Sequence, residues 1–164
     1  MNKSSTIFLQ GVISIIGIVS LAILIRFPLT EGRAANLDLF SIYTDPFILF
    51  GYVASIPFFI ALFNVFKLLG YIGQNKAFSL NSVRIFRTIK YCAIAVSILI
   101  VMAGIYIRIF HNKDDDPAGF LTLCLVTTFV SLVIATAVAL FENILQNGVD
   151  IKSENDHLFE QSKM

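Results

Sequence analysis

The stretch Lys67–Lys90, KLLGYIGQNKAFSLNSVRIFRTIK, decides how this chain is built. It carries five of the twelve basic residues and no acidic one, and long apolar runs flank it on both sides. In membrane proteins, a short basic loop between two apolar segments stays on the cytoplasmic side. The stretch therefore predicts two membrane spans that are joined by a loop in the cytoplasm.

The composition of the whole chain also indicates a membrane protein. Of its 164 residues, 57% are hydrophobic and 14% are charged, whereas soluble domains average about half and about a quarter. A soluble domain of this size exposes too much surface to hide so many apolar side chains, so the excess is expected to face lipid. The net charge of +1 gives no basic footprint for direct nucleic-acid binding.

Four apolar runs are each long enough to cross about 30 Å of hydrocarbon at about 1.5 Å per residue. They predict an all-α, polytopic membrane protein with four transmembrane helices in an antiparallel bundle. Residues 1–164 are expected to form a single domain with a polar cytoplasmic tail at 142–164. The predicted spans lie at about 7–27, 46–70, 86–110 and 118–141.

The ends and the interiors of these runs carry local structural signals. Arg26, Phe27 and Pro28 follow the first run in place of a small-residue cleavage site, so we expect a retained span rather than a signal peptide. Ser79 is a typical N-cap, which predicts that the third helix begins before the membrane. Pro57 removes a backbone hydrogen bond within the second span and predicts a kink there.

Lysine and arginine are unevenly divided between the two sides of the membrane. The N-terminus, the loop between the second and third spans and the tail together hold eight, and the two other loops hold four. The other loops also carry six acidic residues. By the positive-inside rule, we expect a multi-pass protein of the cell (inner) membrane with both termini in the cytoplasm.

The sequence offers no set of side chains for catalysis. Cys92 and Cys124 are predicted near opposite ends of their spans, too far apart for thiol–disulfide exchange. His111 and His157 are expected on opposite sides of the membrane, so they cannot share a metal or a haem. No phosphate-binding glycine loop or zinc-protease motif occurs. We therefore expect no enzymatic activity, no cofactor and no metal site.

Polar residues within the spans are few. Asn64 lies deep in the second span and is interpreted as a donor of a hydrogen bond to another helix. Together with the kink at Pro57, it keeps open an alternative function, a small transporter or channel subunit that acts as an oligomer. Glu142, at the end of the fourth span, is expected to reach water.

Small residues recur at a spacing that brings helices close together in lipid. Ala93 and Ser97 in the third span are four residues apart. The fourth span has a longer ridge of this kind, formed by Thr127, Ser131, Ala135 and Ala139. We expect these faces to pack within one chain, and contact within a homo-oligomer is the alternative.

One group of residues marks the surface where a partner or a lipid headgroup is expected to bind: Arg84, Arg87, Lys90, Tyr91, Glu154 and Asp156. Arg84, Arg87 and Tyr91 are spaced at i, i+3 and i+7, on one face of the third helix. The acidic tail is long enough, at about 3.3 Å per extended residue, to fold back across that face. Residues 75–90 and the tail thus predict a platform for a cytosolic regulator protein; the alternative is that the charges set topology and contact anionic lipid.

Several of these residues resemble the hallmark of a known family. Phe78-Ser79, Asn81 and Arg84–Ile89 are similar to the segment that opens the third span in small bacterial four-helix membrane proteins catalogued as a domain of unknown function. The step Glu154–Asp156 resembles the tail of that family, and the chain departs from the pattern at His157–Phe159. The resemblance implies a protein of the cytoplasmic membrane that is often encoded beside a small helix-turn-helix regulator, with no known enzymatic activity.

Cysteine labelling tests the predicted topology. Asn36 and Asp115 lie in the predicted outer loops, whereas Asn75 and Ser153 lie in the predicted cytoplasmic segments. We expect a membrane-impermeant maleimide to label cysteines placed at the first two positions in intact cells. Cysteines at the other two positions should react only after the membrane is permeabilised. Labelling of Asn75→Cys in intact cells would contradict the orientation.

Overall fold

A computed structural model describes residues 3–30, 43, 46–74, 76–110 and 118–161. They form the helices α1 (Lys3–Thr30), α3 (Pro46–Gly73), α4 (Leu80–Phe110) and α5 (Ala118–Gln161). Each helix contains one of the apolar runs, and all four are long and apolar enough to cross a membrane. The prediction of an all-α, four-helix membrane protein is confirmed. The boundaries of the four spans and of the tail stay predictions, and the labelling positions Asn36, Asn75 and Asp115 lie outside the described residues.

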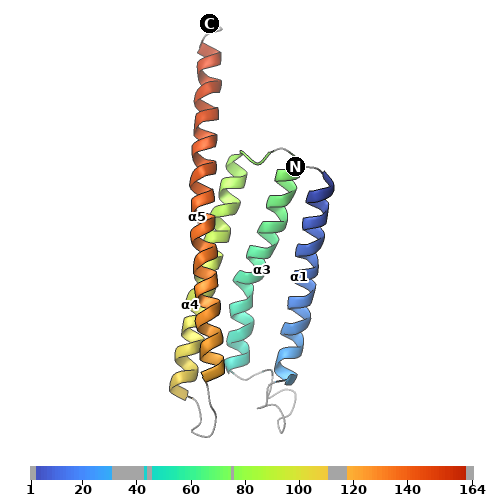
Figure 1. Ribbon diagram of the computed structural model, residues 1–164, viewed down its shortest axis with the longest axis vertical. Helices are drawn as coiled ribbons and strands as arrows, with labels where there is room; N and C mark the ends of the chain where they lie inside the picture. Colours follow the sequence, from blue (N-terminus) through green and yellow to red (C-terminus); the bar gives the residue numbers. More distant parts are fainter. Residues whose placement is uncertain (1–2, 31–42, 44–45, 75, 111–117, 162–164) are drawn as a thin grey trace.

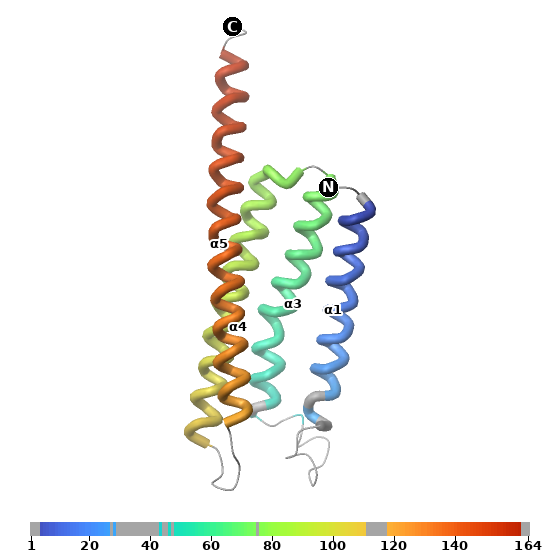
Figure 2. Tube along the Cα trace, in the orientation of Figure 1, coloured from blue at the N-terminus to red at the C-terminus, as the bar shows by residue number. Residues whose placement is uncertain are grey.

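The helices are antiparallel and stand in a row (Figure 1). α1 packs on α3, α3 packs on α4, and α4 packs on α5, which the tube in Figure 2 makes easy to follow. Much of α1 faces outward, as at Ile7 and Ile18, which are 67% and 69% exposed within the chain. We call the end of the bundle that holds Gly73 and Leu80 the terminal end, because both chain termini point that way.

The turn between α3 and α4 is fixed by two serines. The Ser79 hydroxyl accepts a hydrogen bond from the backbone N–H of Ser82 at 3.3 Å, which is the bond expected of an N-cap. The Ser82 hydroxyl is fully buried and donates to the Lys76 carbonyl at 3.2 Å. The predicted cap is therefore confirmed, and α4 begins at Leu80, before its predicted span. On the other side of the turn, α3 continues through Pro57 as one helix.

A small hydrophobic core lies at the terminal end, where α3, α4 and α5 meet. Its buried centre is formed by Leu68, Ile85 and Ile89. The partly buried side chains around it are Val65, Tyr71, Ile72, Phe86 and Val138. Because lipid is as apolar as these residues, the core contributes close packing rather than a hydrophobic driving force.

Small and hydroxylated residues hold α4 against α5. The Ser131 hydroxyl donates to the Ala93 carbonyl across the helix pair at 2.8 Å. The same carbonyl accepts a second bond from Ser97 at 3.0 Å. Ser131 and Ala135 of the predicted ridge are buried, whereas the Thr127 hydroxyl bonds to a carbonyl of its own helix. The close approach that the small residues predicted is therefore observed at Ser131.

The polar tail is a continuation of α5. Residues 142–161 are helical, so the expectation that an extended tail folds back across α4 is wrong. At about 1.5 Å per residue, the 44 residues of α5 extend about 66 Å, whereas a bilayer with its headgroups is about 40–45 Å thick. The tail rises beyond the other helices (Figure 1). Residues 150–161 are all exposed, and we call them the free segment only because they lie beyond the ends of the other helices.

One glycine explains how the turn after α3 supports α5 below the free segment. A Cβ atom at Gly148 would lie 3.0 Å from Cδ1 of Phe78, a tight contact that the ring would have to shift to relieve. The absence of a side chain at Gly148 therefore makes room for the Phe78 ring. The ring braces α5 from the side, although glycine itself has a low helix propensity.

Gly73→Ala tests the contact between α1 and α3. The new Cβ would lie 2.9 Å from Cγ2 of Thr6, whose β-branched side chain has little freedom to move. We expect a loss of about 1–2 kcal/mol in stability, measured as a lower melting temperature in detergent micelles. Thr6→Ala in the same chain should restore part of the loss.

Gly11→Ala is the matched control for this experiment. Its Cβ would meet nothing within 4 Å, and alanine favours the helix by up to about 1 kcal/mol. The Gly11 variant should therefore melt at or above the wild-type temperature. Equal melting of the two variants would contradict the packing of α1 on α3.

Candidate functional site

Three charged side chains from α4 and α5 meet at the terminal end. Oε1 of Glu142 accepts a hydrogen bond from Nε of Arg87 at 2.8 Å, and Oε2 accepts one from Nζ of Lys90 at 2.5 Å. Glu142 is only 5% exposed. These three residues, which we call the Glu142 cluster, form the main charged contact between helices in the described part of the chain.

The positions of these residues in the sequence explain the contact. Arg87 and Lys90 are three residues apart, so both lie on the same side of α4. Glu142 follows Ala135 by seven residues, or about two turns, and therefore continues the face of α5 that packs on α4. Because the two helices are antiparallel, the start of α4 lies beside this late part of α5. The seven-residue spacing is the signal that sequence reasoning missed.

The expectation that Glu142 reaches water is wrong. Glu142 is the first residue beyond the predicted span. Hydrogen bonds from Lys90 and Arg87 hold the pKa of its carboxyl below the usual value, although burial acts in the opposite direction. Its carboxylate is thus charged at neutral pH, and two cations take the place of water around it. Two positive charges against one negative charge leave the cluster net positive, with the Arg87 side chain 55% exposed.

The other residues predicted on α4 lie around this cluster. Tyr91 is 61% exposed, and its ring centroid is 5.4 Å from Nζ of Lys90, within the range of a cation–π contact. Arg84 is exposed and lies about one turn nearer the start of α4 than Arg87. The structure therefore brings the predicted basic and aromatic residues of α4 together, with Arg87 and Lys90 directed at Glu142. Their contact with a partner or with lipid stays a prediction.

The two acidic residues predicted for the same surface lie elsewhere. Glu154 and Asp156 are in the free segment, about 18 and 21 Å beyond Glu142 along the helix. Two residues turn a helix by about 200°, so these side chains lie on nearly opposite faces. Asp156 lines a shallow hollow of about 270 Å³, and Glu154 does not. The structure does not bring either of them to the basic residues of α4.

The amide within the membrane is satisfied by its own helix. Nδ2 of Asn64 donates to the Ile60 carbonyl at 2.8 Å. The expectation of a bond to another helix is therefore wrong. The Ser14 hydroxyl likewise bonds to the Gln10 carbonyl at 2.9 Å. Such bonds one turn back along the helix let a span carry a polar side chain without a partner helix.

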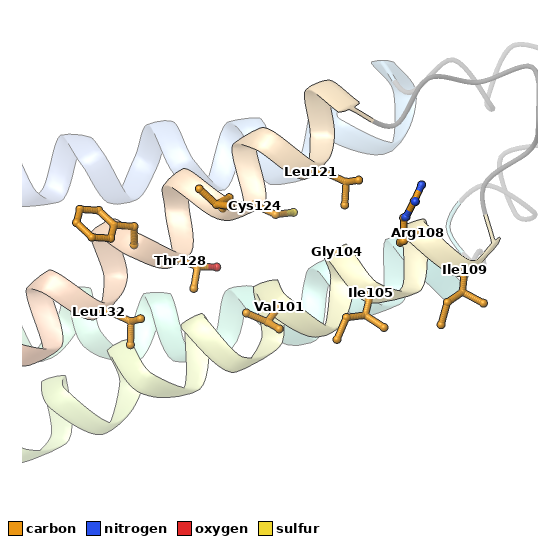
Figure 3. A pocket seen from close by; sticks show the side chains of 11 residues that line it. Val101, Gly104, Ile105, Arg108, Ile109, Leu121, Cys124, Thr128 and Leu132 are labelled. Carbon is orange, nitrogen blue, oxygen red and sulfur yellow. The ribbon is translucent and has the colours of Figure 1, made fainter.

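An apolar groove of about 580 Å³ runs between α4 and α5 at the end opposite the terminal end (Figure 3). The small residues Gly104 and Cys124 face each other there and leave the space open. Arg108 lies at its rim in the same view. The lining suits hydrocarbon, and it consists of Val101, Gly104, Ile105, Arg108, Ile109, Leu121, Cys124, Leu125, Thr128, Phe129 and Leu132.

The histidine, cysteine and acidic residues of the described segments bear on metal binding and on thiol chemistry. Residues 3–30, 46–74, 76–110 and 118–161 hold no group of three or more His, Cys, Asp or Glu that could bind a metal ion. Cys92 and Cys124 are both buried free thiols. His111 lies outside the described residues.

Glu142→Gln tests the role of the cluster. The substitution leaves Lys90, whose side chain is 23% exposed, and Arg87 without a carboxylate. We expect the stability of the chain to fall by about 2 kcal/mol, less than for a deeply buried pair, because Arg87 can turn toward solvent. Melting in detergent micelles at pH 7 measures the loss. Glu160→Gln, which neutralises an exposed acid of the same helix, should leave melting unchanged.

The pH dependence of this loss provides a second check. Because the folded state lowers the pKa of Glu142, its stabilisation is complete above the ordinary carboxyl pKa of about 4.3 and disappears as the pH falls through the folded value. The melting difference between wild type and Glu142→Gln should therefore shrink in acid. A difference that stays constant with pH would contradict the ion pairing.

Comparison with known proteins agrees with this architecture. The family model described as protein of unknown function (DUF2975) matches residues 12–157. The chain is 42% identical over 158 residues to the uncharacterized membrane protein YoaS of Bacillus subtilis (strain 168), covering 95% of this chain and 98% of that protein. No solved structure matches. Neither description points to catalysis. The resemblance to a family of small membrane proteins of unknown function, seen in the segment that opens α4, is confirmed. The chain belongs to the DUF2975 family of proteins of unknown function.

Proposed function

We propose that this integral membrane protein is a non-catalytic interaction module of the cell membrane, with both termini in the cytoplasm. The four antiparallel helices bring the N-terminus, the α3–α4 turn and the free segment to one end (Figure 1). The segments of this end carry eight of the twelve lysines and arginines, which supports a cytoplasmic location for it.

The observation that carries the proposal is the free segment that stands above the terminal end. Asp156 follows Glu142 by about four turns, so it lies on the side of α5 that faces α4 lower down. Glu160 lines the same face, together with Lys152 and Ser153. This face of α5 and the exposed Arg84 at the start of α4 thus form two sides of a corner, one largely acidic and one basic. A cytosolic regulator protein with charges of both signs fits such a corner.

Contact with lipid explains only part of this surface. Arg84 lies near the predicted membrane boundary, where an anionic headgroup attracts a basic side chain by about 1 kcal/mol. Asp156 and Glu160 lie about 21 and 27 Å beyond Glu142 along α5 and carry the wrong charge for anionic lipid. A protein partner accounts for both sides of the corner.

Co-purification from membranes with matched variants tests the proposal. Asp156→Asn with Glu160→Gln removes two acids from the face above α4. Asp150→Asn with Glu154→Gln removes two acids of the same segment that lie off this face, rotated from Glu160 by about 80° and 120°. We expect the first pair to lose the cytosolic protein that wild type retains, and the second pair to keep it.

Arg84→Gln serves as a test of the other side of the corner, because it leaves the Glu142 cluster intact. It should lose the same protein as the first acidic pair. Arg108→Gln, at the far end of α4, is its control and should retain the protein. Recovery of identical proteins by all variants, or of none by wild type, would refute the interaction role.

A further inference from the structure

We propose that the free segment of α5 pairs with the same segment of a second copy of this chain, as a short parallel coiled coil outside the bilayer. The pairing uses the face of α5 that points away from α4. It requires only the length of α5 and its sequence. It therefore holds whichever side of the membrane the terminal end occupies, and whether or not a cytosolic partner binds the corner.

An apolar stripe runs along this outer face. Ile144, Ile151 and Leu158 are seven residues apart and are 61%, 68% and 58% exposed. Ile144 follows Glu142 by two residues, a rotation of about 200°, so the stripe points away from α4. The stripe therefore lies on the side of α5 opposite the one that packs on α4.

Lipid does not reach most of this stripe. Ile151 and Leu158 lie about 14 and 24 Å beyond Glu142 along the helix. A bilayer of about 45 Å, headgroups included, leaves about 20 Å of α5 in water. Although the segment extends a longer helix, Ile151 and Leu158 are exposed and gain little from packing within one chain. Burial of the stripe against another helix would stabilise the segment, because most helical stability in proteins comes from packing of one apolar face.

The sequence of the stripe favours a second copy as the helix that covers it. Asn155 falls between Ile151 and Leu158, so these three residues alternate in steps of four and three, as in a two-stranded coiled coil. The contact begins beyond Gly148, which the Phe78 ring of the same chain covers. An asparagine at such a position fixes the register of a dimer.

Membrane insertion and charge agree with this occupant. Two copies in one membrane have their α5 helices parallel, and a two-fold axis along the membrane normal brings identical faces together. Lys152 lies on one flank of the stripe and Glu154 on the other, so the contact brings no two like charges together. Asp156 and Glu160, on the face above α4, stay outside the contact.

Cysteine cross-linking in native membranes tests the pairing. In the full chain with Cys92 and Cys124 replaced by alanine, Ile151→Cys and Leu158→Cys place one thiol on the stripe. Ser153→Cys and Asp156→Cys place it on the opposite face as matched controls. A short bismaleimide should join the first two variants into dimers and leave the controls as monomers. Equal cross-linking of both faces would overturn the proposal.

Mass measurement in mild detergent gives an independent check. Wild type should have twice the mass of one 18.2 kDa chain. Ile151→Glu with Leu158→Glu should lose the dimer without loss of the fold, because both side chains are exposed in one chain. A wild-type protein that is monomeric, and whose stripe cysteines cross-link to another protein or to nothing, would overturn the inference.

Discussion

The contact between α4 and α5 is the constraint on which the rest of the structure depends. In lipid, helices gain little from apolar burial and associate through close packing and polar bonds. Here the Ser131 hydroxyl reaches the Ala93 carbonyl, and Glu142 pairs with two cations about 16 Å further along α5. Two such points fix both the register and the rotation of α5. They therefore also determine which face of the free segment lies on the side of α4 and which face points away from it.

The basic residues at the start of α4 show how one set of charges has two structural consequences. Lysine and arginine beside an apolar run favour the cytoplasmic side for that end of a span. Arg87 and Lys90 also lie on the side of α4 that faces α5, where Glu142 pairs with both. Arg87 and Lys90, which help to predict the topology, are thus the same residues that hold α5 in place.

Sequence reasoning predicted the features that are local and missed those that depend on distant residues. The four helices follow from the length of the apolar runs, and the Ser79 cap follows from the preference of serine for the N-cap position. The burial of Glu142 depends on cations 52 and 55 residues away, and an acid at the end of a span is usually solvated. The tail was misjudged for another reason. Its polar composition suggests a flexible chain, yet it extends a helix whose nucleation is already complete.

The continuity of α5 has a mechanical consequence. Within residues 143–161, Gly148 has the lowest helix propensity, and the Phe78 ring covers that point. α5 is therefore a continuous helix, supported by Phe78, at the point where it leaves the bundle. A movement of α5 at Leu158 is transmitted along about 40 Å of continuous helix to Ser131, past the Glu142 cluster. A partner that moves the outer end of α5 therefore also moves its transmembrane part.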